Sequence, residues 1–202
     1  MCMARILLAV LTVMALSCQG QQLTQGDRDF TVSALHATRK LFLDSVAALS
    51  PAQLNWKPAP DRWSVMEVAE HIAVSEESLP QMAAKAMQSP AAPDKRKADA
   101  RQQDARILAA VAQRDQKAKA PAELAPAGRF KNLAELVAAF RKARDNNIAY
   151  VRETHDELRS HFTEGPLGEI DALQVYLLMA GHTERHVKQI REVMATPGFP
   201  KR

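Results

Sequence analysis

Two histidines near the C-terminus, His182 and His186, are the residues whose type and spacing most directly suggest chemistry. Residues four apart lie one above the other on a helix, because each turn takes about 3.6 residues. The same helix face carries a set of apolar residues, namely Val175, Leu178, Met179, Ile190 and Val193. The two imidazoles are therefore expected to point into a core, and a shared metal ion is one reason to bury them side by side.

A third candidate ligand is His71, which lies beside an apolar stripe in another expected helix. This helix begins at Ser64, because Ser64 and Glu67 have the spacing of a capping box. Neutral imidazole binds zinc and nickel well, and catalytic sites commonly use three protein ligands and leave one position open. We therefore predict that His71, His182 and His186 bind one divalent metal ion, zinc or nickel. Two alternatives stay open: a metal that only stabilises the fold, and metal-free histidines satisfied by their neighbours.

The residues beside these histidines do not fit the common zinc peptidase pattern. That pattern needs a glutamate directly after the first histidine of the pair, where this chain has Thr183. Glu184 lies about 200° around the helix from that histidine, so it cannot easily reach the same ion. Glu67 and Glu70 flank His71, but each could equally serve as a cap or a surface residue. The sequence therefore names no catalytic base.

The first 18 residues have the features of an export leader. Arg5 precedes a predominantly apolar run from residue 6 to 16, and small and polar residues follow the run. The run is too short to stay in a bilayer as an anchor. Cys18 offers an alternative, a lipoprotein leader, although Ala15 stands where such leaders usually have a leucine-like residue. We expect a protein that is exported, either periplasmic or anchored to the membrane through a lipid on Cys18.

The composition of the 202-residue chain favours helices, because its apolar content comes mainly from alanine, leucine, valine and methionine. Cys2 and Cys18 are the only cysteines, so a mature chain has no disulfide and a metal site must use nitrogen and oxygen ligands. The net charge of +4 is mild and spread along the chain, apart from residues 95–97. Nucleic-acid binding is therefore not suggested. We expect a short linker at 19–25 and one domain at 26–199.

Four long helices are expected in this domain, which makes it an all-α four-helix bundle with a decorated middle connection. Capping pairs at Asn132 and at Asp171 mark two of the starts, and Pro80 ends or kinks the second helix. The expected helices cover residues 23 to about 49, 64 to about 79 with a continuation to 87, 132 to beyond 158, and 171 to about 195.

Two segments between these helices carry further expectations. Residues 51–63 form a loop with three prolines and both tryptophans, Trp56 and Trp63. The indoles seek burial, and we expect them in the core, with a role in walling the metal pocket as the alternative. Residues 88–130 hold a weak helical pattern from 105 to about 116 and are expected to lie across one end of the bundle with solvated charges. The remaining histidines are expected at or near the surface: His36, His155 and His161.

Two stretches of the chain resemble the DinB-like superfamily, also called the DinB/YfiT-like metalloenzymes. They are residues 55–72, NWKPAPDRWSVMEVAEHI, and residues 180–190, AGHTERHVKQI. The resemblance extends over residues 26 to 199. It implies a four-helix bundle with a three-histidine site for a divalent metal, which carries over onto His71, His182 and His186.

The resemblance also implies a class of function. Some relatives are metal-dependent transferases or isomerases that act with bacillithiol, mycothiol or glutathione. This chain departs from the best-known relatives in its export leader and its longer middle section, and such thiols are scarce outside the cytoplasm. We therefore expect a metal-dependent transferase or hydrolase with a small-molecule substrate, no nucleic-acid partner, and membrane contact only through Cys18. A non-catalytic envelope module is the alternative, and a homodimer is left open.

Overall fold

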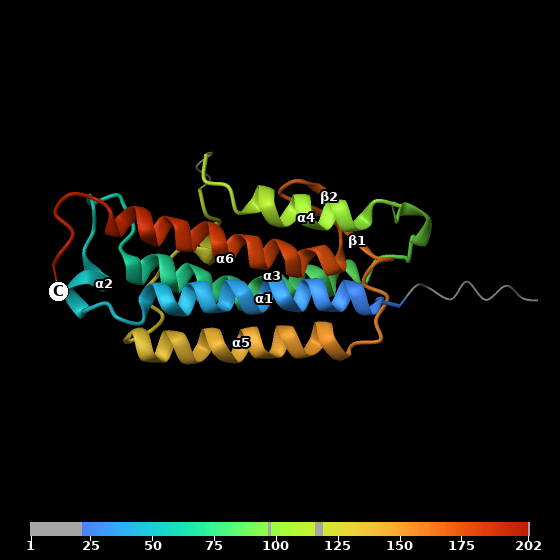
Figure 1. Cartoon of the computed structure of the whole chain (residues 1–202), viewed down its shortest axis with the longest axis horizontal. Coiled ribbons are helices and arrows are strands. Elements are labelled where there is room, and N and C mark those ends of the chain that lie inside the picture. The colour runs from blue at the N-terminus through green and yellow to red at the C-terminus, as the bar shows by residue number, and fades with distance from the viewer. Residues whose placement is uncertain (1–21, 97, 116–118, 202) are drawn as a thin grey trace, which may run out of the picture.

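Four long helices form the body of the molecule (Figure 1). The computed structural model describes residues 22–96, 98–115 and 119–201. The four helices are α1 (Gln25–Val46), α3 (Val65–Ala86), α5 (Leu133–Glu153) and α6 (Ala172–Met194). Each of α1 and α3 packs against both α5 and α6. The predicted all-α four-helix bundle is therefore confirmed, whereas the predicted leader at residues 1–18 lies outside the described residues.

Capping side chains mark the start of all four long helices, and three of these starts, those of α3, α5 and α6, were predicted. Ser64 and Asp171 each accept a hydrogen bond from the backbone N–H three residues later. The side chains of Glu67 and Gln174 accept in return from the N–H of the capping residue, which completes two capping boxes. Asn132 caps α5 through one such bond. All three predicted starts are confirmed.

Helix α3 continues through Pro80 to Ala86. This agrees with the predicted continuation of the helix to residue 87. A proline inside a helix leaves the carbonyl four residues earlier without its usual partner. Here that carbonyl belongs to Glu76, and it accepts a hydrogen bond of 3.1 Å from the side-chain amide of Asn147 in α5. The neighbouring helix thus replaces the bond that Pro80 cannot make.

Helix α5 ends at Glu153, before the predicted end beyond residue 158. The guanidinium group of Arg28 in α1 donates hydrogen bonds of 2.7–3.0 Å to the carbonyl oxygens of Val151, Arg152 and Thr154. These carbonyls lie at the end of the helix, where no further helical N–H reaches them. The stop is therefore set by a distant residue and not by a local proline or glycine.

The direction of the four helices explains the long middle section. Helices α1 and α6 run one way along the long axis, and α3 and α5 run the other way (Figure 1). Because α3 and α5 point the same way, the chain must return along the bundle between them. Helix α4 (Ala100–Val111) makes this return and packs along α6. The expectation that residues 88–130 lie across one end is wrong, and their helix begins at Ala100 rather than at residue 105.

Buried polar contacts and a close backbone approach attach α4 to the bundle. Asp104 of α4 is fully buried and accepts hydrogen bonds of 2.6 and 2.8 Å from Arg159, which also bonds to Asp171 at 2.9 Å. A Cβ at Gly181 of α6 would lie 2.7 Å from the carbonyl oxygen of Leu108, so the two helices can approach this closely only at a glycine. The expectation that the charges of this section are solvated is wrong for Asp104.

Shorter elements complete the fold. They are α2 (Pro51–Asn55), the 3-10 turns η1 (Pro93–Lys95) and η2 (Ala122–Leu124), and an antiparallel hairpin of β1 (Phe162–Gly165) and β2 (Gly168–Asp171). Residues 51–55 were expected as loop but form α2, because Ser50 caps the turn and Pro51 suits its first position. The hairpin was not predicted, since strands of four residues show too little alternation to detect. None of the described helices has the length and apolar character needed to cross a membrane.

The core consists of two apolar clusters with a polar layer between them. One cluster contains Leu35, Ile148 and Ala180, and the other contains Phe42, Phe140, Ile72 and Val187. On each long helix a buried polar residue lies between members of the two clusters. These residues are Thr38 on α1, Glu76 on α3, Arg144 on α5 and Thr183 on α6. The guanidinium group of Arg144 bonds to all three others, at 2.5–2.9 Å, so one side chain connects the four helices.

Candidate metal centre

The three predicted histidines meet between α3 and α6. The Nε2 atom of His71 lies 3.1 Å from Nε2 of His182 and 3.1 Å from Nε2 of His186. The ring centroids of the three imidazoles are 4.4–4.9 Å apart. His71 and His186 are buried, and His182 is half-buried. Among the described residues, these three form the group of histidine, cysteine or acidic side chains that could hold a metal ion.

The outer nitrogens of two of these rings determine their tautomers. Nδ1 of His71 lies 2.8 Å from the carbonyl oxygen of Leu124 in η2. Nδ1 of His186 lies 2.8 Å from Oε1 of Gln189, three residues later on α6. A carbonyl or amide oxygen can only accept a hydrogen bond, so each Nδ1 carries the proton. Each Nε2 is therefore left with a free lone pair, which is the state that a metal ion requires.

Burial keeps the three imidazoles neutral. Burial, with the neighbouring His71 and Arg185 as lesser causes, lowers the pKa of His182 to about 3. Burial also lowers the pKa of His71, against a smaller opposing effect of the hydrogen bond to Leu124. Burial, with His182 and His71 as lesser causes, holds the pKa of His186 well below its usual range. Neutral imidazoles at physiological pH are therefore available as ligands.

The donor set fits a divalent metal ion. The unprotonated Nε2 atoms of His71 and His186 face each other at 3.1 Å, and no hydrogen bond can form between two lone pairs. A cation between them removes this repulsion. Two nitrogens each about 2.0–2.1 Å from one tetrahedral zinc ion lie about 3.3 Å apart, so the observed spacing is close to that of a shared ion. Three nitrogen ligands leave a position open for water or substrate, and the partial exposure of His182 gives solvent access to the group.

The loop before α5 is held against α3 beside the histidines. The carboxylate of Glu70 is buried and accepts hydrogen bonds of 2.8–3.1 Å from the backbone N–H groups of Ala127, Gly128 and Arg129. Glu70 is thus neither a cap nor a surface residue. Glu70 fixes the segment that carries the Leu124 carbonyl. The next residue of α3, His71, lies within hydrogen-bond distance of that carbonyl.

The other residues singled out from the sequence lie apart from the metal group, with one exception. The ring of Trp63 lies against His71, with centroids 5.3 Å apart, and both tryptophans pack against the second apolar cluster. His36 and His155 are exposed. His161 is half-buried, with Nδ1 2.8 Å from the carbonyl oxygen of Ser89. Trp63 therefore serves both the core and the wall of the site.

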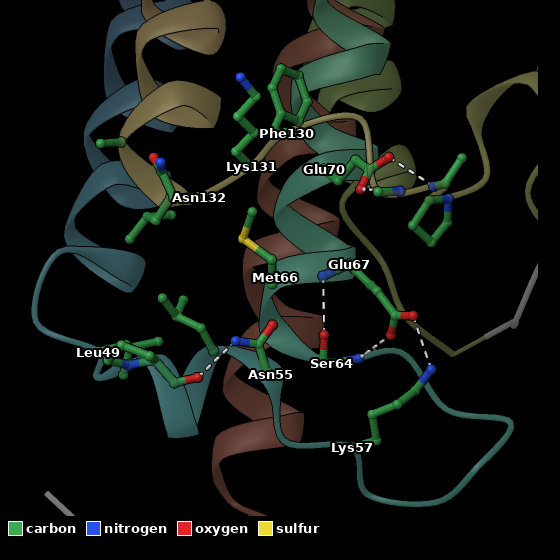
Figure 2. Close-up of a pocket in the computed structure, with 17 residues that line it drawn as sticks. Leu49, Asn55, Lys57, Ser64, Met66, Glu67, Glu70, Phe130, Lys131 and Asn132 are labelled. Carbon is green, nitrogen blue, oxygen red and sulfur yellow. Dashed lines mark hydrogen bonds and ion pairs between the residues drawn. The ribbon is translucent and has the colours of Figure 1, made fainter.

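A separate hollow of about 740 Å³ lies between α2 and the first turns of α3 and α5 (Figure 2). Its lining does not include the three histidines. Figure 2 shows the carboxylate of Glu67 directed at Ser64 and Lys57, with which it bonds at 2.7 and 2.9 Å. The amide of Asn55 donates to the carbonyl oxygen of Pro51. Because these polar groups are already paired, the histidine group and not this hollow is the candidate site.

Two contributors to the site were not predicted from the sequence: Gln189 and the Leu124 carbonyl. Gln189 lies three residues after His186, on the same helix face, so helical spacing could have identified it. Leu124 lies in η2, in a section with only weak helical patterning. Nothing in the sequence pattern places its carbonyl beside His71.

Comparison with known proteins agrees with this fold. The chain is similar to the solved structure of YfiT from Bacillus subtilis, described as a probable metal-dependent hydrolase with an unusual four-helix bundle topology. The TM-score is 0.57 at 15% identity, over 89% of this chain and 93% of that chain, which supports the fold alone. A search of curated proteins gave no significant match. The family model of the DinB superfamily matches residues 34–190, which include all three histidines, and the chain therefore belongs to the DinB superfamily.

Proposed function

We propose that this protein is an exported metal-dependent hydrolase or transferase whose divalent ion, zinc or nickel, is held by His71, His182 and His186. One observation carries the proposal: the Nε2 atoms of His71 and His186 lie 3.1 Å apart while the Nδ1 atom of each ring faces an oxygen acceptor. With the protons on Nδ1, this approach of two lone pairs is favourable only with a cation between them. The description of YfiT as a probable hydrolase supports hydrolysis of a small-molecule substrate. The resemblance to thiol-dependent relatives supports group transfer as the other reaction.

The open coordination position favours a catalytic role of the metal ion over a purely structural one. Structural zinc sites are closed by four protein ligands, whereas three histidines leave room for a further ligand. A bound divalent ion would supply Lewis-acid activation of a water molecule or a substrate thiol at that position. The protein holds the three rings neutral by burial and orients two of them through the Leu124 carbonyl and Gln189. Trp63 covers one side of His71 and limits the access of water.

Metal analysis of the purified domain tests the ligand assignment. We expect one zinc or nickel ion per wild-type chain and no bound metal above background in His182→Ala, because two histidines alone bind such ions weakly. His155→Ala is the matched control, since His155 is exposed and distant from the group. Equal metal content in wild type and His182→Ala would overturn the proposed site. A fourth protein ligand in a metal-loaded crystal structure would favour the structural module instead.

Export is proposed on the sequence of residues 1–18 alone. We expect the full chain, produced in a bacterial host, to be found in the membrane fraction if Cys18 is lipidated, and Cys18→Ser to move it out of that fraction. Fractionation with immunodetection of both forms measures this. An unprocessed chain in the cytoplasm for both forms would contradict export, and a processed, soluble wild type would show a cleaved leader without lipid.

A further inference from the structure

We propose that Arg114 and Gln189 act together as positioning residues, which select the tautomer of His186 that can bind a metal ion. The inference rests on the proposed metal site and adds to it a role for the section between α3 and α5. Arg114 follows the end of α4, and Gln189 lies on α6. The contact therefore lets one element outside the four-helix bundle act on a ligand inside it.

Two acidic contacts fix the orientation of the Arg114 guanidinium. Its Nε and Nη2 atoms donate to the two carboxylate oxygens of Glu192, at 3.1 and 2.8 Å. This bidentate geometry holds the planar group and directs its remaining nitrogen, Nη1, at Oε1 of Gln189, at 3.2 Å. The Arg114 side chain is 17% exposed and that of Glu192 is 45% exposed, so the carboxylate meets solvent while the guanidinium group is mostly covered.

The guanidinium determines which way the Gln189 amide faces. An amide can turn over and exchange its oxygen for its NH₂ group at little cost when no neighbour distinguishes them. A guanidinium has only donors, so it donates a hydrogen bond to the amide oxygen and repels the NH₂ group. The Oε1 atom of Gln189 accepts the hydrogen bond from Arg114, and the same atom lies 2.8 Å from Nδ1 of His186. Arg114 therefore places an acceptor, and never a donor, beside that nitrogen.

The orientation of this amide decides whether His186 can be a ligand. With the oxygen facing it, Nδ1 must carry the proton and Nε2 keeps its lone pair toward His71 and His182. With the amide turned over, the NH₂ group would donate to Nδ1, and the proton of the neutral ring would move to Nε2, where it would block metal binding. His71 needs no such control, because its partner is the backbone carbonyl of Leu124, which has no alternative donor form.

The test compares four variants of the metal-free protein with wild type by nitrogen-15 NMR of the histidine rings, which distinguishes the two neutral tautomers. We expect His186 of wild type to carry its proton on Nδ1, and Arg114→Ala and Gln189→Leu to lose this preference. Gln189→Glu should keep it, since a carboxylate offers only acceptors. For the same reason Arg114→Ala should have no effect on the tautomer in the Gln189→Glu background. This dependence on background separates positioning from a general loss of packing.

Metal affinity, measured by competition with a chelator, is the second readout. Loss of a partner of this kind typically weakens metal binding by about 10–100-fold, and we expect that range for Arg114→Ala and Gln189→Leu. Arg106→Ala is the matched control, because Arg106 is an exposed arginine of α4, the helix that Arg114 follows. Arg114→Lys, which keeps a donor, should retain most of the affinity and serves if the alanine variant does not fold.

The outcomes separate this inference from the proposed function. A wild-type His186 protonated on Nε2, or an unchanged tautomer in both Arg114→Ala and Gln189→Leu, would overturn the positioning role without any metal present. Failure of wild type to bind zinc or nickel, with the expected tautomers in all variants, would overturn the metal site and leave the positioning role standing.

Discussion

Replacing Arg144 by methionine is expected to lower the free energy of unfolding by about 3–5 kcal/mol, the usual cost of removing one partner from a buried ion pair. Arg144 and Glu76 are both buried, and two nitrogens of the guanidinium bond to the Glu76 carboxylate at 2.5 and 2.7 Å. In the variant the carboxylate would keep only a 3.3 Å bond from Thr183. Urea unfolding followed by circular dichroism measures the loss.

A surface ion pair between α1 and α5 gives the matched control. Arg39 bonds to Asp145 at 2.5 Å, but the Asp145 side chain is 55% exposed, so Arg39→Met should cost less than about 1 kcal/mol. Adding Glu76→Gln to Arg144→Met should recover part of the stability, because it removes the unpaired buried charge. Equal losses in Arg144→Met and Arg39→Met would show that the polar layer does not hold the four helices together.

The sequence predicts the four long helices well because their starts are local. Each capping residue and its partner lie three positions apart, so a short window contains the whole signal. The path of α4 depends instead on residues far apart in the chain. Asp104 must meet Arg159, and Leu108 must approach Gly181 where a side chain is missing. Neither contact leaves a periodic pattern, and the weak helix was therefore misplaced by about five residues and expected at one end of the bundle.

The candidate site likewise has features that local sequence predicts and features that depend on distant residues. The spacing of His182 and His186 and the apolar face around them are local, and the well-capped helix of His71 supplies the third ring. The tautomers of His71 and His186 depend on partners from the section between α3 and α5, namely the Leu124 carbonyl and Arg114. Every residue has a backbone carbonyl, so the residue type of Leu124 does not indicate its role. An arginine that follows a weakly patterned helix cannot be distinguished in sequence from an ordinary surface charge. Sequence therefore identifies which residues meet but not the protonation states that make them ligands.

The metal-free protein is expected to lose stability as the pH falls below about 6.5, because the three site histidines take up protons on unfolding. Their folded-state pKa values are lowered below the ordinary 6.5, to about 3 for His182. Between these values the unfolded chain binds protons that the folded chain does not, so the free energy of unfolding decreases with decreasing pH. At pH 4.5, two units below 6.5, His182 alone should account for about 2–3 kcal/mol.

Comparing histidine variants between pH 6.5 and 4.5 isolates this contribution. Each strongly shifted histidine adds about 1.4 kcal/mol per pH unit to the slope, so His182→Gln should make the pH dependence shallower by about that amount. His36→Gln, which changes an exposed histidine of α1, is the matched control. The window lies above the range where Asp27, whose pKa is lowered by Arg159 and Thr24 against the effect of burial, would add its own loss. Identical slopes for wild type and His182→Gln, in urea titrations with a chelator present, would mean that the site opens and takes up protons before the protein unfolds.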